Sequence, residues 1–197
     1  MNFLFSKWSG AQLGLPPVGV LVIDAILVAF LLYCAYTDST RGKIYNKVTF
    51  PAMALGLILN GVFGGWTGLG WAFLGWCVGM GIQWVPYSMG LAKAGDVKLL
   101  AAVGALKGWA FCGFGFLYGA AAFGLLWIPK LMKSGEMKAV GNNLKGYLQT
   151  AAVTQSVPDA PEPTVRRYAP WGLGLVIGFL IALILERLTG RPTWIQF

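Results

Sequence analysis

The chain of 197 residues contains no histidine, and its three cysteines stand far apart within apolar runs. Histidine and closely spaced cysteines are the usual ligands of zinc and of haem iron. Their absence argues against such sites, and we expect neither a metal nor a cofactor. It also leaves no histidine to activate a nucleophilic cysteine. Cys34, Cys77 and Cys112 are therefore interpreted as small buried hydrophobic residues.

Charge is scarce as well. Charged residues make up 11% of the chain and hydrophobic residues 57%, whereas a soluble domain is about a quarter charged. This composition predicts a membrane protein with a single membrane domain. The net charge is +8, but the basic residues lie in the gaps between apolar runs. That placement favours a role in membrane topology and contacts with anionic lipids, and we expect no binding to nucleic acid.

Apolar runs separated by short polar or glycine-rich turns predict an all-α, polytopic membrane protein of about six transmembrane helices. The expected spans are 18–36, 48–63, 69–85, 96–106, 109–128 and 171–188. Pro86 and Pro129 are expected to end the third and fifth spans. The membrane domain is expected to cover residues 18–190. Residues 1–17 lack the features of a cleaved signal peptide and are expected to lie outside the cytoplasm.

Residues 130–169 form the one long polar stretch and are expected to be a cytoplasmic loop. Within it, apolar residues recur at helical spacing, which predicts an interfacial amphipathic helix. The stripe consists of Met137, Val140, Leu144, Tyr147 and Leu148. The proline-rich segment 158–163 is expected to be a flexible connector.

The 15 basic residues are distributed unevenly between the two sides that this topology defines. Eleven lie in or beside the turns that follow the first, third and fifth spans, and four lie on the other side. The eleven are Arg41, Lys43, Lys47, Lys93, Lys98, Lys130, Lys133, Lys138, Lys145, Arg166 and Arg167. Cytoplasmic loops carry an excess of Lys and Arg, so these turns are expected to be cytoplasmic and both termini to lie outside.

Only seven residues are acidic, and two of them fall at the same expected membrane boundary. Asp38 follows the first span and Asp96 opens the fourth. Taken singly, Asp96 could be a helix N-cap, and Asp38 could be a surface acid paired with Arg41 or Lys43. Their shared depth instead favours one site, in which the two carboxyl groups approach within hydrogen-bond or one-water distance.

Two carboxyl groups at such a distance share a proton, because two like charges are costly to hold side by side. The ionised member can deprotonate a water, and the protonated member can polarise a scissile carbonyl and later donate to the leaving amine. Asp24 is the competing acid. It lies about 21 Å before Asp38 along the first helix, near the opposite boundary, where a water-facing or helix-packing role is expected.

Three segments of the chain, residues 36–46, 94–102 and 167–170, resemble segments of the type IV prepilin peptidases, which are membrane aspartic proteases with a Gly-x-Gly-Asp signature. The resemblance is greatest to the short form found with tight-adherence (Flp-type) pili. It implies that Asp38 and Asp96 are catalytic and that Gly95, Lys93 and Lys98 support the site.

Two residues depart from the family pattern. Lys93 stands where the first Gly of the signature is expected, and Tyr45 replaces a Pro. Lys93 places a cation close to Asp96, which favours the ionised carboxylate. On the pattern alone, a Lys93→Gly change is expected to leave activity intact or to raise it.

The resemblance implies a membrane-embedded aspartic endopeptidase of the bacterial inner membrane. Its expected substrates are type IV prepilins and pseudopilins, whose leader peptides it removes at the cytoplasmic face. Longer members carry an N-terminal cytoplasmic domain with paired cysteines linked to N-methylation; residues 1–17 could not supply it, so we expect no methyltransferase activity.

Two alternatives stay open. A catalytically impaired family member could act as a pilus-assembly partner, and the cation of Lys93 supports that reading. A small proton-coupled transporter could use Asp38 and Asp96 as a relay, although relay acids normally lie near the middle of the membrane. The residues do not indicate an oligomeric state.

Overall fold

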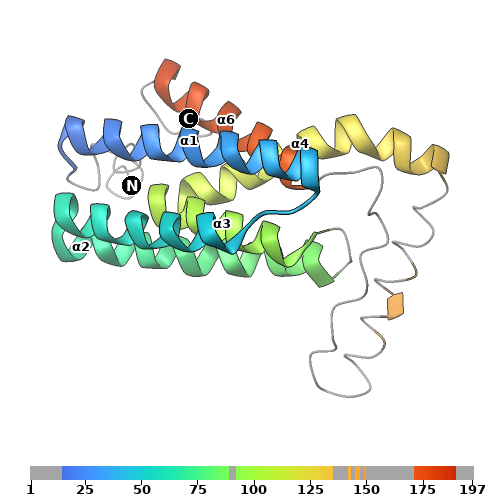
Figure 1. Cartoon of the computed structure of the whole chain (residues 1–197), viewed down its shortest axis with the longest axis horizontal. Coiled ribbons are helices and arrows are strands. Elements are labelled where there is room, and N and C mark those ends of the chain that lie inside the picture. The colour runs from blue at the N-terminus through green and yellow to red at the C-terminus, as the bar shows by residue number, and fades with distance from the viewer. Residues whose placement is uncertain are drawn as a thin grey trace, which may run out of the picture.

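The computed structural model describes residues 15–88, 92–134, 142, 145–146, 149 and 171–189. The fold is all-helical, and the described part of the chain contains no strand. Its elements, in order, are α1 (Pro17–Arg41), α2 (Asn46–Ser88), α3 (Ala94–Lys107), α4 (Trp109–Ser134) and α6 (Trp171–Thr189) (Figure 1).

Four of these helices, α1, α2, α4 and α6, are long and apolar enough to cross a membrane. Many of their large hydrophobic side chains are exposed, as expected for helices whose outer faces contact lipid. The prediction of an all-α integral membrane protein is therefore confirmed. α3 has 14 residues, which corresponds to about 21 Å of helix, and it is not one of the four. The number six for the membrane spans stays a prediction.

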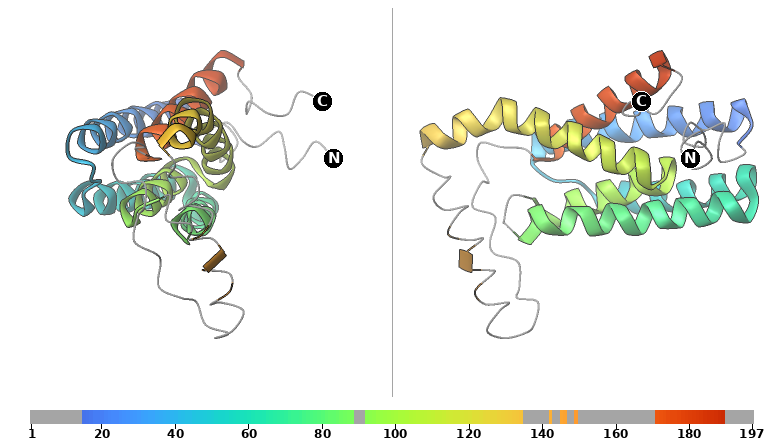
Figure 2. Two further views of the ribbon diagram at one scale, coloured as in Figure 1. Left: turned by 90° about the vertical axis from the view of Figure 1, so that its right-hand side faces the viewer. Right: turned by 180° about the vertical axis from the view of Figure 1, so that it is seen from behind.

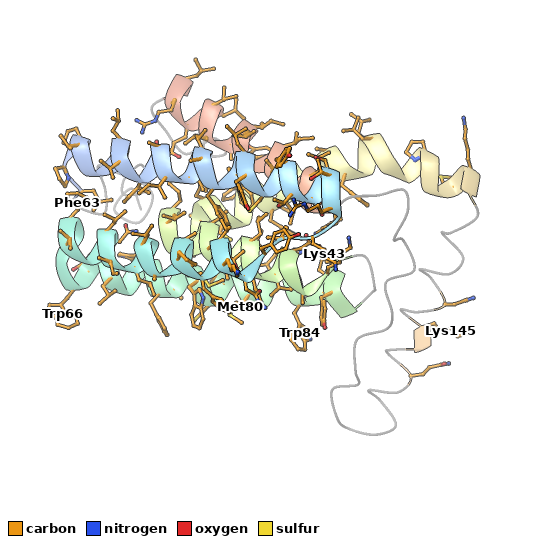
Figure 3. The ribbon with its side chains drawn as sticks, viewed as in Figure 1. Lys43, Phe63, Trp66, Met80, Trp84 and Lys145 are labelled. Carbon is orange, nitrogen blue, oxygen red and sulfur yellow. The ribbon has the colours of Figure 1, made fainter. Side chains whose placement is uncertain are left out.

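α2 is a helical hairpin. Its backbone leaves helical geometry at Gly65, where φ is 60° and ψ is −154°, a conformation that glycine adopts without steric cost. The two arms, 46–64 and 66–88, then run antiparallel: Phe63 and Trp66 lie at one end of the bundle, whereas Trp84 lies toward the other end, with Lys43 (Figure 3). The expected spans 48–63 and 69–85 correspond to these arms, but the break is sharper than the turn predicted over residues 64–68.

Two helices continue past the prolines that were expected to end them. Pro86 lies inside α2, which reaches Ser88, and Pro129 lies inside α4, which reaches Ser134. Both predicted ends were wrong. Proline in a membrane helix is tolerated because neighbouring groups can satisfy the carbonyl that loses its hydrogen bond.

α3 is the most buried helix, and every residue from Leu99 to Leu106 is buried. In a view along the bundle, α1 and α6 lie on one side and the arms of α2 on the other (Figure 2). Small residues allow α3 and α2 to approach closely. A Cβ on Gly75 would lie 2.1 Å from the Gly104 carbonyl oxygen, and one on Gly79 would lie 2.5 Å from that of Leu100. Such contacts are typical of helix packing in membranes.

Several predictions lie outside the described residues. They are the placement of residues 1–14, the amphipathic stripe Met137, Val140, Leu144, Tyr147 and Leu148, the connector 158–163, and the segment 167–170.

Candidate active site

Asp38 lies in the last turn of α1, with only 5% of its surface exposed. The expected span ended at Tyr36, but the helix continues to Arg41 and is closed by Gly42, whose φ of 61° is left-handed. The backbone N–H of Leu173, in the first turn of α6, donates a hydrogen bond to the Asp38 carboxylate. Burial is inconsistent with a surface acid paired with Arg41 or Lys43, and that interpretation is wrong.

Asp96 lies in the first turn of α3 and is 3% exposed. The helix begins at Ala94 with Lys93 as its N-cap, so the interpretation of Asp96 as the N-cap, and as the first residue of the helix, is wrong. Its Oδ2 accepts a 2.7 Å hydrogen bond from the backbone N–H of Lys93. This bond secures one oxygen of the carboxyl group at the start of the helix.

Gly172, the second residue of α6, lies between the two acids. A Cβ on Gly172 would lie 2.8 Å from Asp38 Oδ2 and 2.8 Å from Asp96 Oδ1. Since both oxygens are that close to one point, they are at most about 5.6 Å apart, which one bridging water can span. Asp38 Oδ2 is buried and has no hydrogen-bond partner among the described residues. The structure therefore brings Asp38 and Asp96 together.

The three residues expected to support the site contact either the segment that joins α1 to α2 or the first residue of α2. Lys93 Nζ donates a 2.8 Å hydrogen bond to the carbonyl oxygen of Gly42. A Cβ on Gly95 would lie 3.1 Å from the Cβ of Ile44, so the absence of a side chain permits this approach. Lys98 Nζ donates a 2.8 Å hydrogen bond to Asn46 Oδ1. These contacts hold the first turn of α3 against the end of α1.

The electrostatic surroundings of Asp96 favour a bound proton. Burial raises the pKa of this carboxyl to about 7, and the negative charge of Asp38 raises it further. The Lys93 N–H bond and, to a smaller extent, the Lys93 ammonium act in the opposite direction. At neutral pH the site can thus hold one proton between two carboxyl groups, which is the state that an acid–base pair needs.

A second group of charged residues lies at the opposite end of α1, α3 and α6. Lys107 Nζ forms ion pairs with Asp24 at 2.9 Å and with Glu186 at 3.1 Å, and Arg187 also pairs with Asp24. We call Asp24, Lys107, Glu186 and Arg187 the charge network. Asp24 therefore has the helix-packing role that was one of its two expected roles. Since Lys107 follows Asp96 by 11 residues, the network lies about 16 Å along α3 from the acid pair.

Sequence reasoning missed Gly172, Glu186 and the pairing of Lys107. The sequence could have indicated Glu186, because an acid inside an apolar run requires a partner. Gly172 is one of 28 glycines and has no distinguishing local pattern. Among the described residues, no three His, Cys, Asp or Glu side chains gather into a group that could hold a metal ion.

Comparison with known proteins identifies the family of the chain. The profile of the type IV leader peptidase family matches residues 25–128, a range that contains both Asp38 and Asp96. The prepilin peptidase EppA of Methanothermobacter thermautotrophicus is 35% identical over 89 residues. That match covers 43% of this chain and 23% of the relative, so the chain spans well under two thirds of the relative's length. No solved structure matches the chain. Because the family profile covers more than half of its 197 residues, the chain belongs to the type IV leader peptidase family.

Proposed function

We propose that the protein is a membrane aspartic endopeptidase that removes leader peptides from type IV prepilins and pseudopilins, with Asp38 and Asp96 as its catalytic pair. The observation that carries the proposal is the position of Gly172. A Cβ at this position would lie 2.8 Å from one oxygen of each carboxyl group, and both acids are buried. Neither acid forms an ion pair with any of the residues that the structure describes, so both are available for proton transfer.

The reaction needs one ionised and one protonated member of the pair. The ionised carboxylate takes a proton from a water molecule as the water oxygen attacks the scissile carbonyl carbon, and the protonated carboxyl donates its proton to the carbonyl oxygen. The tetrahedral intermediate, a gem-diol, then collapses. One carboxyl passes its proton to the leaving nitrogen as the C–N bond breaks, and one hydroxyl of the diol returns its proton to the other carboxylate as the new C=O forms. The products are a new carboxyl and a new amine, and the pair returns to its singly protonated state.

Each acid is oriented by a main-chain N–H at the start of a helix. Leu173 in the first turn of α6 serves Asp38, and Lys93 at the N-cap of α3 serves Asp96. Hydrogen bonds from helix N-termini stabilise negative charge. They leave Asp38 Oδ2 and Asp96 Oδ1 beside Gly172, and these two oxygens are the ones that we assign to water activation and carbonyl polarisation.

We further propose that this end of the bundle faces the cytoplasm and that the substrates are prepilins of the Flp type. The uneven distribution of basic residues supports the orientation. A prepilin presents a basic leader followed by an apolar helix, so its cleavage site lies at the membrane boundary where the acid pair is expected. The resemblance of segments 36–46 and 94–102 to the short family form supports the Flp type.

The position of the Lys93 ammonium weakens the case for a catalytically impaired family member. It donates to Gly42 rather than forming an ion pair with Asp38 or Asp96. The acid pair also lies at one end of α3, with the charge network at the other end. The structure gives no chain of acids through the middle of the described helices that would favour a proton-coupled transporter.

The test is cleavage of a co-expressed prepilin by Asp38→Asn and Asp96→Asn variants, with folded enzyme measured in the same membranes. We expect cleavage to fall by at least about a thousandfold for each. The double variant should be scarcely worse than either single variant, because the two acids act as a unit. Asp24→Asn is the matched control and should cleave nearly normally per folded molecule. Normal cleavage by either Asp38→Asn or Asp96→Asn would exclude the proposed mechanism.

A further inference from the structure

The second arm of α2 carries a buried polar side chain whose hydrogen-bonding groups are both unused. Gln83 is 0% exposed, and neither its Oε1 nor its Nε2 has a partner among the described residues. The other buried carboxamide of the hairpin, Asn60, is satisfied on one side: its Nδ2 donates to the carbonyl oxygens of Gly56, Ala105 and Leu106, whereas its Oδ1 has no partner among the described residues. A buried amide without partners is costly. In a membrane enzyme, a bound ligand can supply the hydrogen-bond partners that such an amide lacks.

The register of α2 on α3 places Gln83 at the level of the acid pair. Gly75 contacts Gly104, and Gly79 contacts Leu100, so the two helices run antiparallel with matched steps of four residues. The next step along both helices pairs position 83 with Asp96. Residues four apart share a helix face, so Gln83 extends the row of Gly75 and Gly79 that packs against α3. Trp84, its neighbour, is drawn at the same end of the bundle as Lys43 (Figure 3).

We propose that the Gln83 carboxamide binds the main chain of the substrate beside the scissile peptide bond. A peptide must be extended to be cleaved, and this exposes C=O and N–H groups that are costly to leave without hydrogen bonds inside a membrane protein. A carboxamide offers one acceptor and two donors, and can therefore pair with an N–H and a C=O of the same extended strand. On this proposal, the amide lacks a partner within the described part of the chain because its partner arrives with the substrate.

This inference rests on the proposed peptidase function and adds a substrate-binding residue to it. The proposed binding requires no specific side chain on the substrate, since the Gln83 carboxamide pairs only with main-chain groups. Gln83 therefore contributes to affinity for any extended peptide that reaches the acid pair.

Gln83→Met tests the proposal, because methionine has similar length and no polar group. We expect kcat/KM for a prepilin peptide to fall about 10- to 100-fold, mainly through KM, while thermal stability stays equal or rises because an unsatisfied buried amide has been removed. Asn60→Leu is the matched control. It removes an amide that is already bonded within the fold, so it should lower stability with little change in KM per folded molecule.

A cross-linking experiment tests the same contact without turnover. In an Asp96→Asn background with the three native cysteines changed to alanine, Gln83→Cys should form a disulfide with a cysteine placed next to the cleavage site of the prepilin. Trp84→Cys, on the outward face and 48% exposed, should not. This readout remains informative if Gln83→Met fails to fold.

The outcomes separate the two proposals. If Asp38→Asn and Asp96→Asn abolish cleavage but Gln83→Met leaves KM within twofold and Gln83→Cys gives no selective cross-link, Gln83 is only a buried amide and the peptidase mechanism stands. If the aspartate variants cleave normally, the mechanism itself is wrong, whatever Gln83 does.

Discussion

The ammonium of Lys93 donates a 2.8 Å hydrogen bond to the carbonyl oxygen of Gly42. This bond joins the residue that closes α1 to the N-cap of α3. Each of these helices carries one member of the acid pair within a turn of the contact, so the bond restrains their separation. Lysine stands here where glycine is expected from the Gly-x-Gly-Asp signature that the sequence resembles, and its ammonium makes a structural contact.

The Lys93→Met change removes this bond and should leave the folded bundle intact. We expect cleavage to fall about tenfold, because the two carboxyl groups are then held together less firmly. Lys93→Gly should behave similarly, which replaces the expectation drawn from the family pattern alone. The control is Lys98→Met, which removes a hydrogen bond to Asn46 rather than to the α1 cap and should retain most activity. Equal losses for the two methionine variants would mean that position 93 has no special role.

Gly172→Ala should abolish cleavage. The added methyl would lie 2.8 Å from one oxygen of each acid, closer than a carbon and an oxygen pack, and would fill the space where water must sit between them. We expect a loss of at least about a hundredfold with the protein still inserted in the membrane, measured by prepilin processing and enzyme abundance. Gly81→Ala is the control, since a Cβ at Gly81 meets nothing within 4 Å. Full activity of Gly172→Ala would contradict the geometry of the pair.

The proposed mechanism predicts a pH limit near 7 on the alkaline side. The pKa of Asp96 is raised to about 7, and cleavage needs one protonated carboxyl, so activity should fall as the pH rises through that value and the proton is lost. The Lys93 cation lowers this pKa, so Lys93→Met should move the alkaline limit to higher pH. Initial cleavage rates of purified enzyme between pH 5 and 9 measure both effects. If the alkaline limit of Lys93→Met moves to lower pH instead, the assignment of this limit to the Asp96 proton is contradicted.

The charge network should govern stability more than catalysis. Lys107→Met leaves Asp24 and Glu186 buried without their shared cation, and the loss of one partner from such a group costs about 3–5 kcal/mol. Thermal unfolding in detergent should detect it. Arg187→Met should cost less than about 1 kcal/mol, because the Arg187 side chain is 51% exposed.

Neutralising the whole buried group separates charge from packing. Combining Lys107→Met with Asp24→Asn and Glu186→Gln removes both acids that lost the Lys107 cation, so it should recover much of the stability lost by Lys107→Met alone. If the combined variant is less stable than the single one, the network contributes through specific hydrogen bonds rather than through charge balance.

Several properties of this protein follow from the sequence alone. The scarcity of charge and the long apolar runs determine a helical membrane protein, because only helices and closed barrels satisfy the backbone within lipid. The same scarcity makes each acid informative, and the matched depth of Asp38 and Asp96 was readable from the order of spans and turns. The residues around Lys93, Gly95 and Lys98 carried enough pattern to indicate the family.

The tertiary structure decided the rest, because it depends on which helix faces which. Gly172 matters only because its missing side chain meets two carboxyl groups from α1 and α3, and nothing in its own segment signals this. The partners of Lys107 come from helices 79 and 83 residues away in sequence, and the level of Gln83 depends on how glycines of α2 seat against α3. Local sequence sets the helices and their depth, but the contacts between distant helices are set by packing, and those contacts bring the two acids together.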